Sequence, residues 1–203
     1  QAVAAGHRAL ELRYAWVLDE FASTAGVETT VSMADLEAAS PAVLLWIAAR
    51  ADRQSDQSLA RAALERLIDE HGETAWAADA SLALARLAWA ERDATEARRL
   101  LEPIREISPG SKAAALALLL ESEILAHEGN LDEAIATAET ILQVREWRGP
   151  LWPQALFQIG ELLLQEGRYR EAFAYFQRIY ILYGGETEWV ARASLLSALC
   201  LEK

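Results

Sequence analysis

The chain has 203 residues, of which 53% are apolar and 25% charged, a composition typical of a globular protein and not of a disordered or disulfide-built one. Its formal net charge is −12, and such an acidic surface argues against binding to a nucleic-acid backbone. The longest uninterrupted apolar run, Ala113 to Leu120, is far shorter than the roughly 20 residues of a membrane-spanning helix. We therefore expect no nucleic-acid partner and no direct membrane insertion.

Residues 1–40 are expected to form an N-terminal capping region. Side chains at alternating steps of four and three predict one helix with a single apolar seam, and we interpret it as a cap on the helices that follow. A short coiled coil is the alternative interpretation of the same seam. A loop and a short helix opened by Ser32 with Asp35 complete the region. The seam residues are Val3, His7, Leu10, Tyr14, Val17 and Phe21.

Residues 41–203 contain an internal repeat with a period of 37 or 38 residues. A short motif ends in alanine at four places, and an amphipathic pattern follows each one, which predicts a helix. Twelve residues before each alanine lies another small residue, on a preceding helix. Each unit therefore consists of a helix A, a short polar turn, a helix B and a longer loop. The alanines are Ala60, Ala97, Ala134 and Ala172, and the earlier small residues are Ala48, Ala85, Ser122 and Gly160, with Ser197 following.

The helix boundaries carry characteristic residues. Asp93 and Asn130 are expected to be N-caps of B helices, because each is followed by a glutamate three residues later. Pro41 and Pro153 are expected at the first position of an A helix, where a missing N–H is tolerated. A last A helix is predicted from Val190 to Lys203.

Two residues depart from this pattern. Glu121 stands where the other A helices have isoleucine or leucine, so its carboxylate must pair with an arginine, remain protonated or turn outward. Pro103 falls inside a B helix, where it removes one backbone hydrogen bond and is expected to kink the helix. We interpret both departures as structural.

The repeat resembles the tetratricopeptide repeat (TPR) family. The resemblance covers residues 41–203 and implies an all-α fold, a right-handed α-solenoid of about four helix-turn-helix repeats and a terminal A-type helix, with the N-terminal cap before them. It further implies that small residues such as Gly160 and Ala172 lie where helices A and B cross closely. The clearest copy supplies Gly160, Leu163, Gly167, Tyr169, Ala172, Phe176 and Ile179 in the family's order.

The loops between repeats are longer than is common in the family. Gly72 to Trp76 recurs as Gly185 to Trp189, displaced by 113 residues, and this loop style is similar to that of bacterial cell-envelope TPR proteins. The resemblance favours the periplasm or cell envelope as the compartment and leaves the cytoplasm open.

No catalytic or metal-binding motif stands out in the sequence. There is no glycine-rich phosphate loop, no His-Glu-x-x-His and no Gly-x-Ser-x-Gly, while Cys200 is the single cysteine and the three histidines are widely spaced. We therefore expect a protein that is not an enzyme and binds neither a cofactor nor a metal.

The resemblance implies instead that A-helix side chains line a concave groove for a protein or peptide partner. We expect this wall to be an exposed apolar strip with aromatic anchors. Trp16, Trp76, Trp147, Trp152 and Trp189 are expected to stack or to anchor loops. The alternative is a structural or homo-oligomeric segment whose groove is filled by its own flanks or by a second copy. The implied groove residues are Leu45, Trp46, Leu82, Arg86, Trp89, Leu119, Glu123, Phe157, Gln158 and Glu161, with Gln154 and Gln165 beside them.

Overall fold

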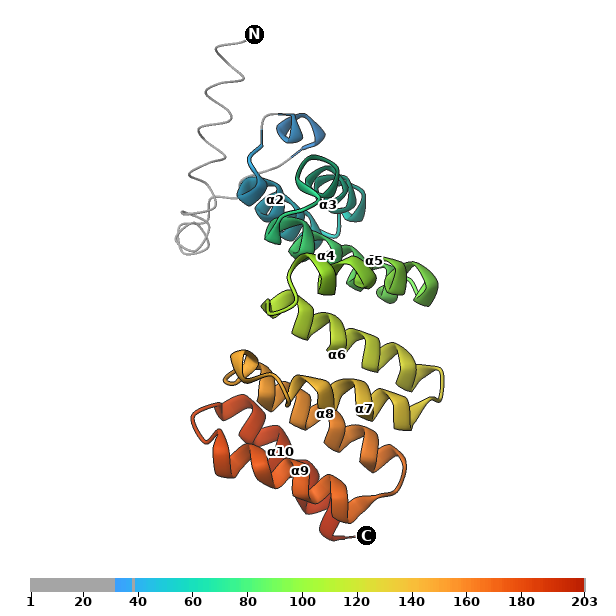
Figure 1. Ribbon diagram of the computed structural model, residues 1–203, viewed down its shortest axis with the longest axis vertical. Coiled ribbons are helices and arrows are strands. Elements are labelled where there is room, and N and C mark those ends of the chain that lie inside the picture. Colours follow the sequence, from blue (N-terminus) through green and yellow to red (C-terminus); the bar gives the residue numbers. More distant parts are fainter. Residues whose placement is uncertain (1–31, 38, 203) are drawn as a thin grey trace. The chain divides into compact units, whose positions relative to one another are not determined.

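Helices account for all the regular structure in the computed structural model, which describes residues 32–37 and 39–202 (Figure 1). The predicted N-terminal helix, its seam and Trp16 lie outside the described residues, so the capping interpretation stays a prediction. The all-α expectation is confirmed, and consecutive helices pack against one another as a solenoid requires. The chain divides into two compact units between Leu84 and Ala85.

The first unit contains the 3₁₀ helix η1 (Met33–Leu36), α2 (Pro41–Arg53), α3 (Gln57–His71) and α4 (Ala75–Ala90) as far as Leu84. Helices α2 and α3 pack as an A–B pair, and η1 lies against α3. The Asp35 carboxylate accepts a hydrogen bond of 2.9 Å from the backbone N–H of Ser32, which confirms the predicted start of the short helix. The buried core of this pair includes Leu44, Ile47, Ala63 and Leu67.

The second unit begins with the last residues of α4 and continues through α5 (Ala94–Ile107), α6 (Lys112–His127), α7 (Leu131–Ile141) and η2 (Arg145–Trp147). It ends with α8 (Leu151–Gln165), α9 (Tyr169–Leu182) and α10 (Thr187–Leu201). Helices α6 and α7 form one A–B pair and α8 and α9 the next, with α10 packed on α9.

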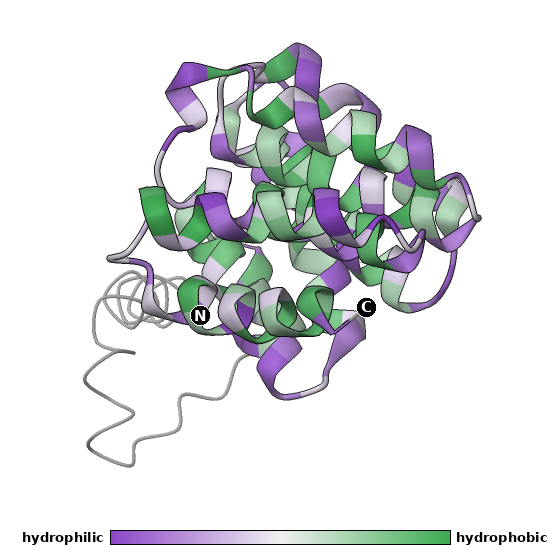
Figure 2. Ribbon diagram, turned by 90° about the horizontal axis from the view of Figure 1, so that it is seen from below, coloured by the Kyte–Doolittle hydropathy of each residue, from purple (hydrophilic) through white to green (hydrophobic). Residues whose placement is uncertain are grey.

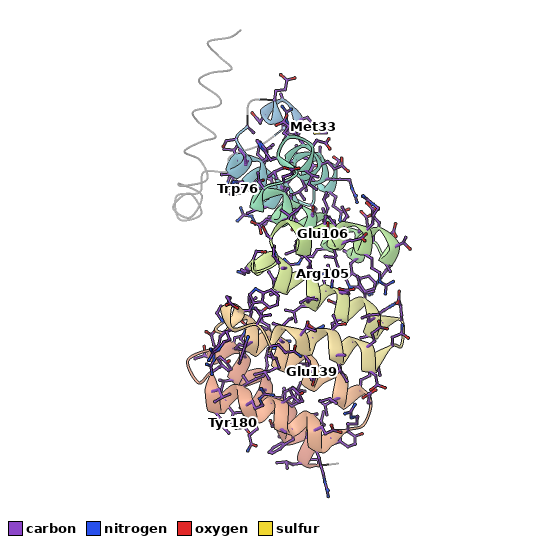
Figure 3. The ribbon with its side chains drawn as sticks, viewed as in Figure 1. Met33, Trp76, Arg105, Glu106, Glu139 and Tyr180 are labelled. Carbon is purple, nitrogen blue, oxygen red and sulfur yellow. The ribbon has the colours of Figure 1, made fainter. Side chains whose placement is uncertain are left out.

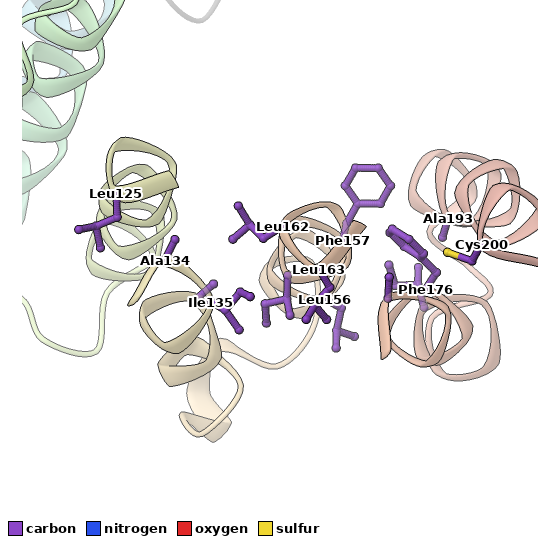
Figure 4. Close-up of a cluster of buried hydrophobic side chains, with 14 residues drawn as sticks. Leu125, Ala134, Ile135, Leu156, Phe157, Leu162, Leu163, Phe176, Ala193 and Cys200 are labelled. Carbon is purple, nitrogen blue, oxygen red and sulfur yellow. The ribbon is translucent and has the colours of Figure 1, made fainter. Parts of the chain in front are cut away.

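The helices of the second unit share an apolar core. Figure 4 shows its C-terminal part, where Phe157 and Phe176 meet between α8, α9 and α10, with Cys200 beside them. The two phenyl centroids are 5.6 Å apart in a tilted arrangement. Hydrophobic and hydrophilic residues alternate around the helices in Figure 2, as amphipathic helices require.

The backbone conformation of the A-to-B turns recurs with the same period as the sequence repeat. One residue in each of the four turns has a positive φ, and these residues lie at intervals of 37, 37 and 38 along the chain. The third and fourth turns use Gly129 and Gly167, which adopt this conformation readily, whereas Ser55 and Arg92 adopt it against the steric preference of their side chains.

The close approach of helices A and B takes two forms. In the third repeat, the Ser122 hydroxyl donates a hydrogen bond of 2.7 Å to the backbone carbonyl of Ala134, as the expected crossing requires. In the fourth repeat, the ring of Phe176 occupies the space beside Gly160, and the expected close approach of Gly160 to Ala172 stays a prediction.

The predicted helix starts are partly correct. Asp93 caps α5, because its carboxylate accepts a hydrogen bond of 2.9 Å from the N–H of Glu96. Asn130 stands at the N-cap of α7, but the prediction of a side-chain cap is wrong, since Asn130 makes no such bond. Pro41 is the first residue of α2 as predicted, whereas α8 begins two residues before Pro153. Pro153 is therefore the third residue of α8. A backbone N–H at this position has no partner within the helix, so a proline can occupy it.

Pro103 and Glu121 both lie in the second unit, and the expected kink at Pro103 stays a prediction. Helix α5 continues through Pro103, whose missing N–H leaves the carbonyl of Arg99 without its helical donor. The Glu121 carboxylate keeps 27% of its side-chain surface exposed and lies 3.6 Å from the Arg105 guanidinium. Of the three alternatives for Glu121, the structure therefore combines outward placement with an arginine partner.

Three of the tryptophans anchor loops or stack as predicted. The indole N–H of Trp147 donates a hydrogen bond of 2.9 Å to the carbonyl of Gly110, which joins two successive inter-repeat loops. Trp152 donates one of 3.3 Å to Val144, and Trp189 packs on the core. The prediction fails for Trp76, which is 43% exposed and lies at the surface of the first unit (Figure 3).

Candidate functional site

Two adjoining hollows lie on one face of the second unit, and we call them together the groove. The first has a volume of about 440 Å³ and is lined by α6, α8 and α10. The second, of about 310 Å³, is lined by the end of α4, by α6 and by α8. Both are lined by Leu119, Glu123, Gln154 and Gln158, so they form one continuous recess over the A-type helices.

Helical periodicity explains why these side chains share a face. Residues spaced by three or four positions lie on one side of a helix, so Gln154, Gln158, Glu161 and Gln165 form a polar row along α8. Seven of the ten residues implied from the sequence line the groove: Arg86, Trp89, Leu119, Glu123, Phe157, Gln158 and Glu161.

A tryptophan is fixed at one end of the groove. The Trp89 indole N–H donates a hydrogen bond of 2.8 Å to the Glu123 carboxylate, and its ring meets the His127 ring edge-on at 5.1 Å. The Arg92 guanidinium lies 5.1 Å from the same ring. Trp89 is only 8% exposed, so it forms the floor of the recess and orients the Glu123 carboxylate at the rim.

An arginine is held over aromatic rings at the other end. The Arg192 guanidinium lies 4.2 Å from the ring centroid of Phe157 and 4.8 Å from that of Trp189. The two rings are themselves 5.4 Å apart. This packing restricts the Arg192 side chain while leaving its N–H groups able to donate hydrogen bonds.

The polar row of α8 offers hydrogen-bonding groups to a ligand. The Gln158 amide N–H₂ donates a bond of 3.0 Å to the carbonyl of Leu119, which leaves the Gln158 side-chain oxygen as an acceptor. Within residues 32–37 and 39–202, neither Gln154 nor Gln165 makes a side-chain hydrogen bond. Primary amides that donate and accept suit the N–H and C=O groups of a peptide backbone.

The charges in the first hollow are mixed. Desolvation raises the pKa of the Glu161 carboxyl, and the positive charge of Arg192 partly offsets that shift. Glu123 adds a second carboxylate to the same hollow. The first hollow therefore combines an apolar floor with carboxylates, one arginine and neutral amides, which is a surface for recognition of polar and apolar groups together.

Comparison with known proteins identifies the family and the fold of the chain. A family model described as a tetratricopeptide repeat-like domain matches residues 21–180. The chain belongs to this family. No curated protein matches the sequence. Among solved structures, a thermophilic TPR protein of Thermus thermophilus aligns with a TM-score of 0.60 and 18% identity, covering 95% of this chain and 98% of that one.

The TPR-like fold is generally a scaffold for protein–protein interaction, and it is typically non-enzymatic. Among the described residues, no three histidine, cysteine, aspartate or glutamate side chains gather as metal ligands would. No helix of residues 32–37 and 39–202 is long and apolar enough to cross a bilayer.

The structure corrects the expectation of an exposed aromatic strip. Phe157 is 3% exposed and Trp89 is 8% exposed, so both rings belong to the packed floor. Leu82 is also buried, and it lies with Leu45 and Trp46 in the first unit of the TPR-like chain, outside the residues that line this groove. The groove as described rests on the second unit alone.

Sequence reasoning missed the contribution of α10 to the site. Arg192 and Trp189 line the first hollow, but only four repeats were used to assign groove positions. Counting the same positions into the fifth A-type helix would have given Ala191, Ser194, Leu195 and Ala198, so the repeat pattern held no signal for Arg192 or Trp189.

Proposed function

We propose that the groove binds a peptide segment or a helix of a partner protein, and that the chain is itself a non-catalytic scaffold. The observation that carries this proposal is the continuous recess over α6, α8 and α10 with glutamine amides, carboxylates and Arg192 at its rim. A partner segment would place apolar side chains toward Leu119 and backbone groups toward Gln154 and Gln158.

We further propose that this scaffold works in a bacterial envelope assembly. The support is the similarity of its long inter-repeat loops, such as Gly185 to Trp189, to those of cell-envelope TPR proteins. Filling of the groove by the chain's own flanks or by a second copy is the alternative.

Site-specific photo-crosslinking in intact cells tests the proposal. A photoreactive amino acid replaces Gln154, which lines the groove, and in a matched control it replaces Glu102, which is exposed on α5 and lines neither hollow. We expect a partner adduct from position 154 alone, identified by mass spectrometry after fractionation of the envelope.

A second variant links the adduct to groove chemistry. Glu161→Lys reverses one exposed groove charge and is expected to weaken the crosslink at position 154, whereas Glu102→Lys leaves it unchanged. Adducts only from position 102 would contradict the groove as the interface. An adduct joining two copies would support the oligomeric alternative, and fractionation outside the envelope would contradict the location.

A further inference from the structure

Two glutamates occupy equivalent positions on neighbouring A-type helices of the groove. Glu123 directly follows the small residue Ser122 on α6, and Glu161 directly follows Gly160 on α8. Helices α6 and α8 both pack on α7 and run in the opposite direction to it, so they are parallel to each other (Figure 1). Both carboxylates line the first hollow, and two negative charges therefore face the same recess.

A hydrogen bond between the two helices sets the register of these glutamates. The Gln158 amide donates a bond of 3.0 Å to the carbonyl of Leu119. Glu161 lies one turn after Gln158 and Glu123 lies one turn after Leu119, so both glutamates follow this bridge at corresponding places. The indole N–H of Trp89 donates to one oxygen of Glu123 at 2.8 Å, which leaves the second oxygen as an acceptor for a ligand.

Neither glutamate forms an ion pair with a residue in the described part of the chain. The nearby Arg192 guanidinium lies over the ring of Phe157 and 3.9 Å from the carboxylate of Glu188 on its own helix. Desolvation raises the pKa of the Glu161 carboxyl, and Arg192 offsets this shift only in part. Two like charges without a counter-ion disfavour each other's ionised form, so a cation placed between them would stabilise both.

The negative pair is confined to the first hollow. At the same position of the repeat, α4 has Arg86, which lines the second hollow, and α10 has Ala198. The charge at this position therefore changes from positive on α4 to negative on α6 and α8. A partner segment that brought a carboxylate into the first hollow would meet two like charges, whereas a basic side chain would meet two opposite ones.

The lining of the first hollow suits a long basic side chain better than a small cation. Apolar groups of Ala126, Phe157 and Leu162 lie beside the two carboxylates, in a volume of about 440 Å³. Lysine and arginine bury their methylene groups against such surfaces while their charged ends bind polar groups. A metal ion would need further ligands, and no three histidine, cysteine, aspartate or glutamate side chains gather among residues 32–37 and 39–202.

We propose that the groove selects a basic segment of its partner protein, with a lysine or arginine side chain bound between Glu123 and Glu161. This inference rests on the proposed function, because it names the class of partner for the same groove. The aliphatic part of the side chain packs against Phe157 and Leu162, and its N–H groups donate charge-assisted hydrogen bonds to the two carboxylates.

Selection from a library of random peptides displayed on phage tests the proposal, with the 203-residue chain as the bait. We expect the enriched peptides to share a lysine or an arginine. The most enriched peptide is then synthesised with norleucine in place of the lysine, or citrulline in place of the arginine, which keeps the length of the side chain and removes its charge. Its dissociation constant, measured by fluorescence anisotropy, should rise roughly tenfold to a hundredfold.

Two double variants of the chain show whether the groove glutamates are responsible. Glu123→Gln with Glu161→Gln removes both charges and keeps an acceptor for the N–H of Trp89. Glu102→Gln with Glu133→Gln removes two charges from exposed positions that line neither hollow. The net charge of the two variants is equal, so long-range attraction of a basic peptide is matched. The groove variant should bind the basic and the neutral peptide equally, whereas the control should keep the preference, and far-UV circular dichroism verifies that both are folded.

The outcomes separate this inference from the proposed function. Enriched peptides without a basic residue would overturn the inference, and if they crosslink to a photoreactive residue at position 154 they would still support the proposed function. An equal loss of preference in the two double variants would also overturn the inference, because the attraction would then come from total charge. A dimer detected by light scattering that the groove variant dissociates would make a second copy the occupant. The absence of any enriched peptide would count against both proposals.

Discussion

A Cβ atom at Gly160 would lie 2.5 Å from Cε1 of Phe176, which is fully buried between α8, α9 and α10. Real Cβ atoms do not approach a ring so closely, so Gly160→Ala requires movement of a fully buried phenyl group. We expect this substitution to lower the free energy of unfolding by about 1–3 kcal/mol, despite the higher helix propensity of alanine. Urea denaturation measures the difference.

A second substitution tests whether the ring is the cause. Phe176→Leu shortens the facing side chain and reproduces the pairing of Ala85 with Leu101 in the second repeat. The effect of Gly160→Ala should be smaller in the Phe176→Leu background than in the wild type. Equal effects in both backgrounds would mean that Phe176 does not restrict position 160.

The A-to-B turns predict a stabilising substitution. Ser55 has a φ of 61°, a conformation that glycine adopts in the third and fourth turns without a steric penalty. Ser55→Gly is therefore expected to raise the free energy of unfolding by about 0.5–1 kcal/mol. The converse change, Gly129→Ser, should lower it. Thermal unfolding of both variants provides the check, and a loss of stability in Ser55→Gly would refute the argument.

The different burial of Phe157 and Gln154 on α8 predicts that substitutions at these two positions differ sharply in their effect on stability. Phe157 is 3% exposed, so Phe157→Ala should destabilise the fold by about 3–5 kcal/mol. Gln154 lines the groove without a side-chain hydrogen bond among the described residues, and Gln154→Ala should change stability by less than about 0.5 kcal/mol. Chemical denaturation distinguishes the two. If they destabilise equally, Gln154 is part of the packing and does not belong to an open binding surface.

The repeat was predictable because its signals are local and recur. Small residues twelve positions before an alanine, together with glycine turns, gave both the helix pairs and their spacing. The positive φ of Ser55 and Arg92 was not predictable from residue type, since neither residue favours it. The only indication in the sequence was that Ser55 and Arg92 occupy the same position of the repeat as Gly129 and Gly167.

The composition of the groove was predictable, but its exposure was not. Helical spacing placed Trp89 and Phe157 on the correct face. The contacts of these two rings include Glu123 on Trp89 and Arg192 on Phe157, which come from helices more than 30 residues away in the sequence. A pattern within one helix contains no information about such partners, so the polar residues of the groove were predicted, but the burial of the two rings and the place of Arg192 over Phe157 appeared only in the structure.

On the B-helix face of the second unit, Tyr175 on α9 donates a hydrogen bond of 2.5 Å to the carboxylate of Glu139 on α7. Burial and this bond raise the pKa of Tyr175 to about 12 from its ordinary value of 10.0. The folded state therefore retains the phenolic proton over a range in which the unfolded chain loses it. This contribution to stability is complete below pH 10.0 and is lost as the pH rises to about 12.

Tyr175→Phe should consequently reduce the loss of stability between neutral pH and about pH 12, because the variant has no phenol to deprotonate on unfolding. It should also be less stable than the wild type by about 0.5–1.5 kcal/mol at neutral pH, since one hydrogen bond is missing. Tyr180→Phe on the same helix is the matched control for removing a tyrosine hydroxyl. Urea denaturation across this pH range measures both effects, and identical pH profiles for wild type and Tyr175→Phe would show that the Tyr175–Glu139 contact does not couple proton binding to folding.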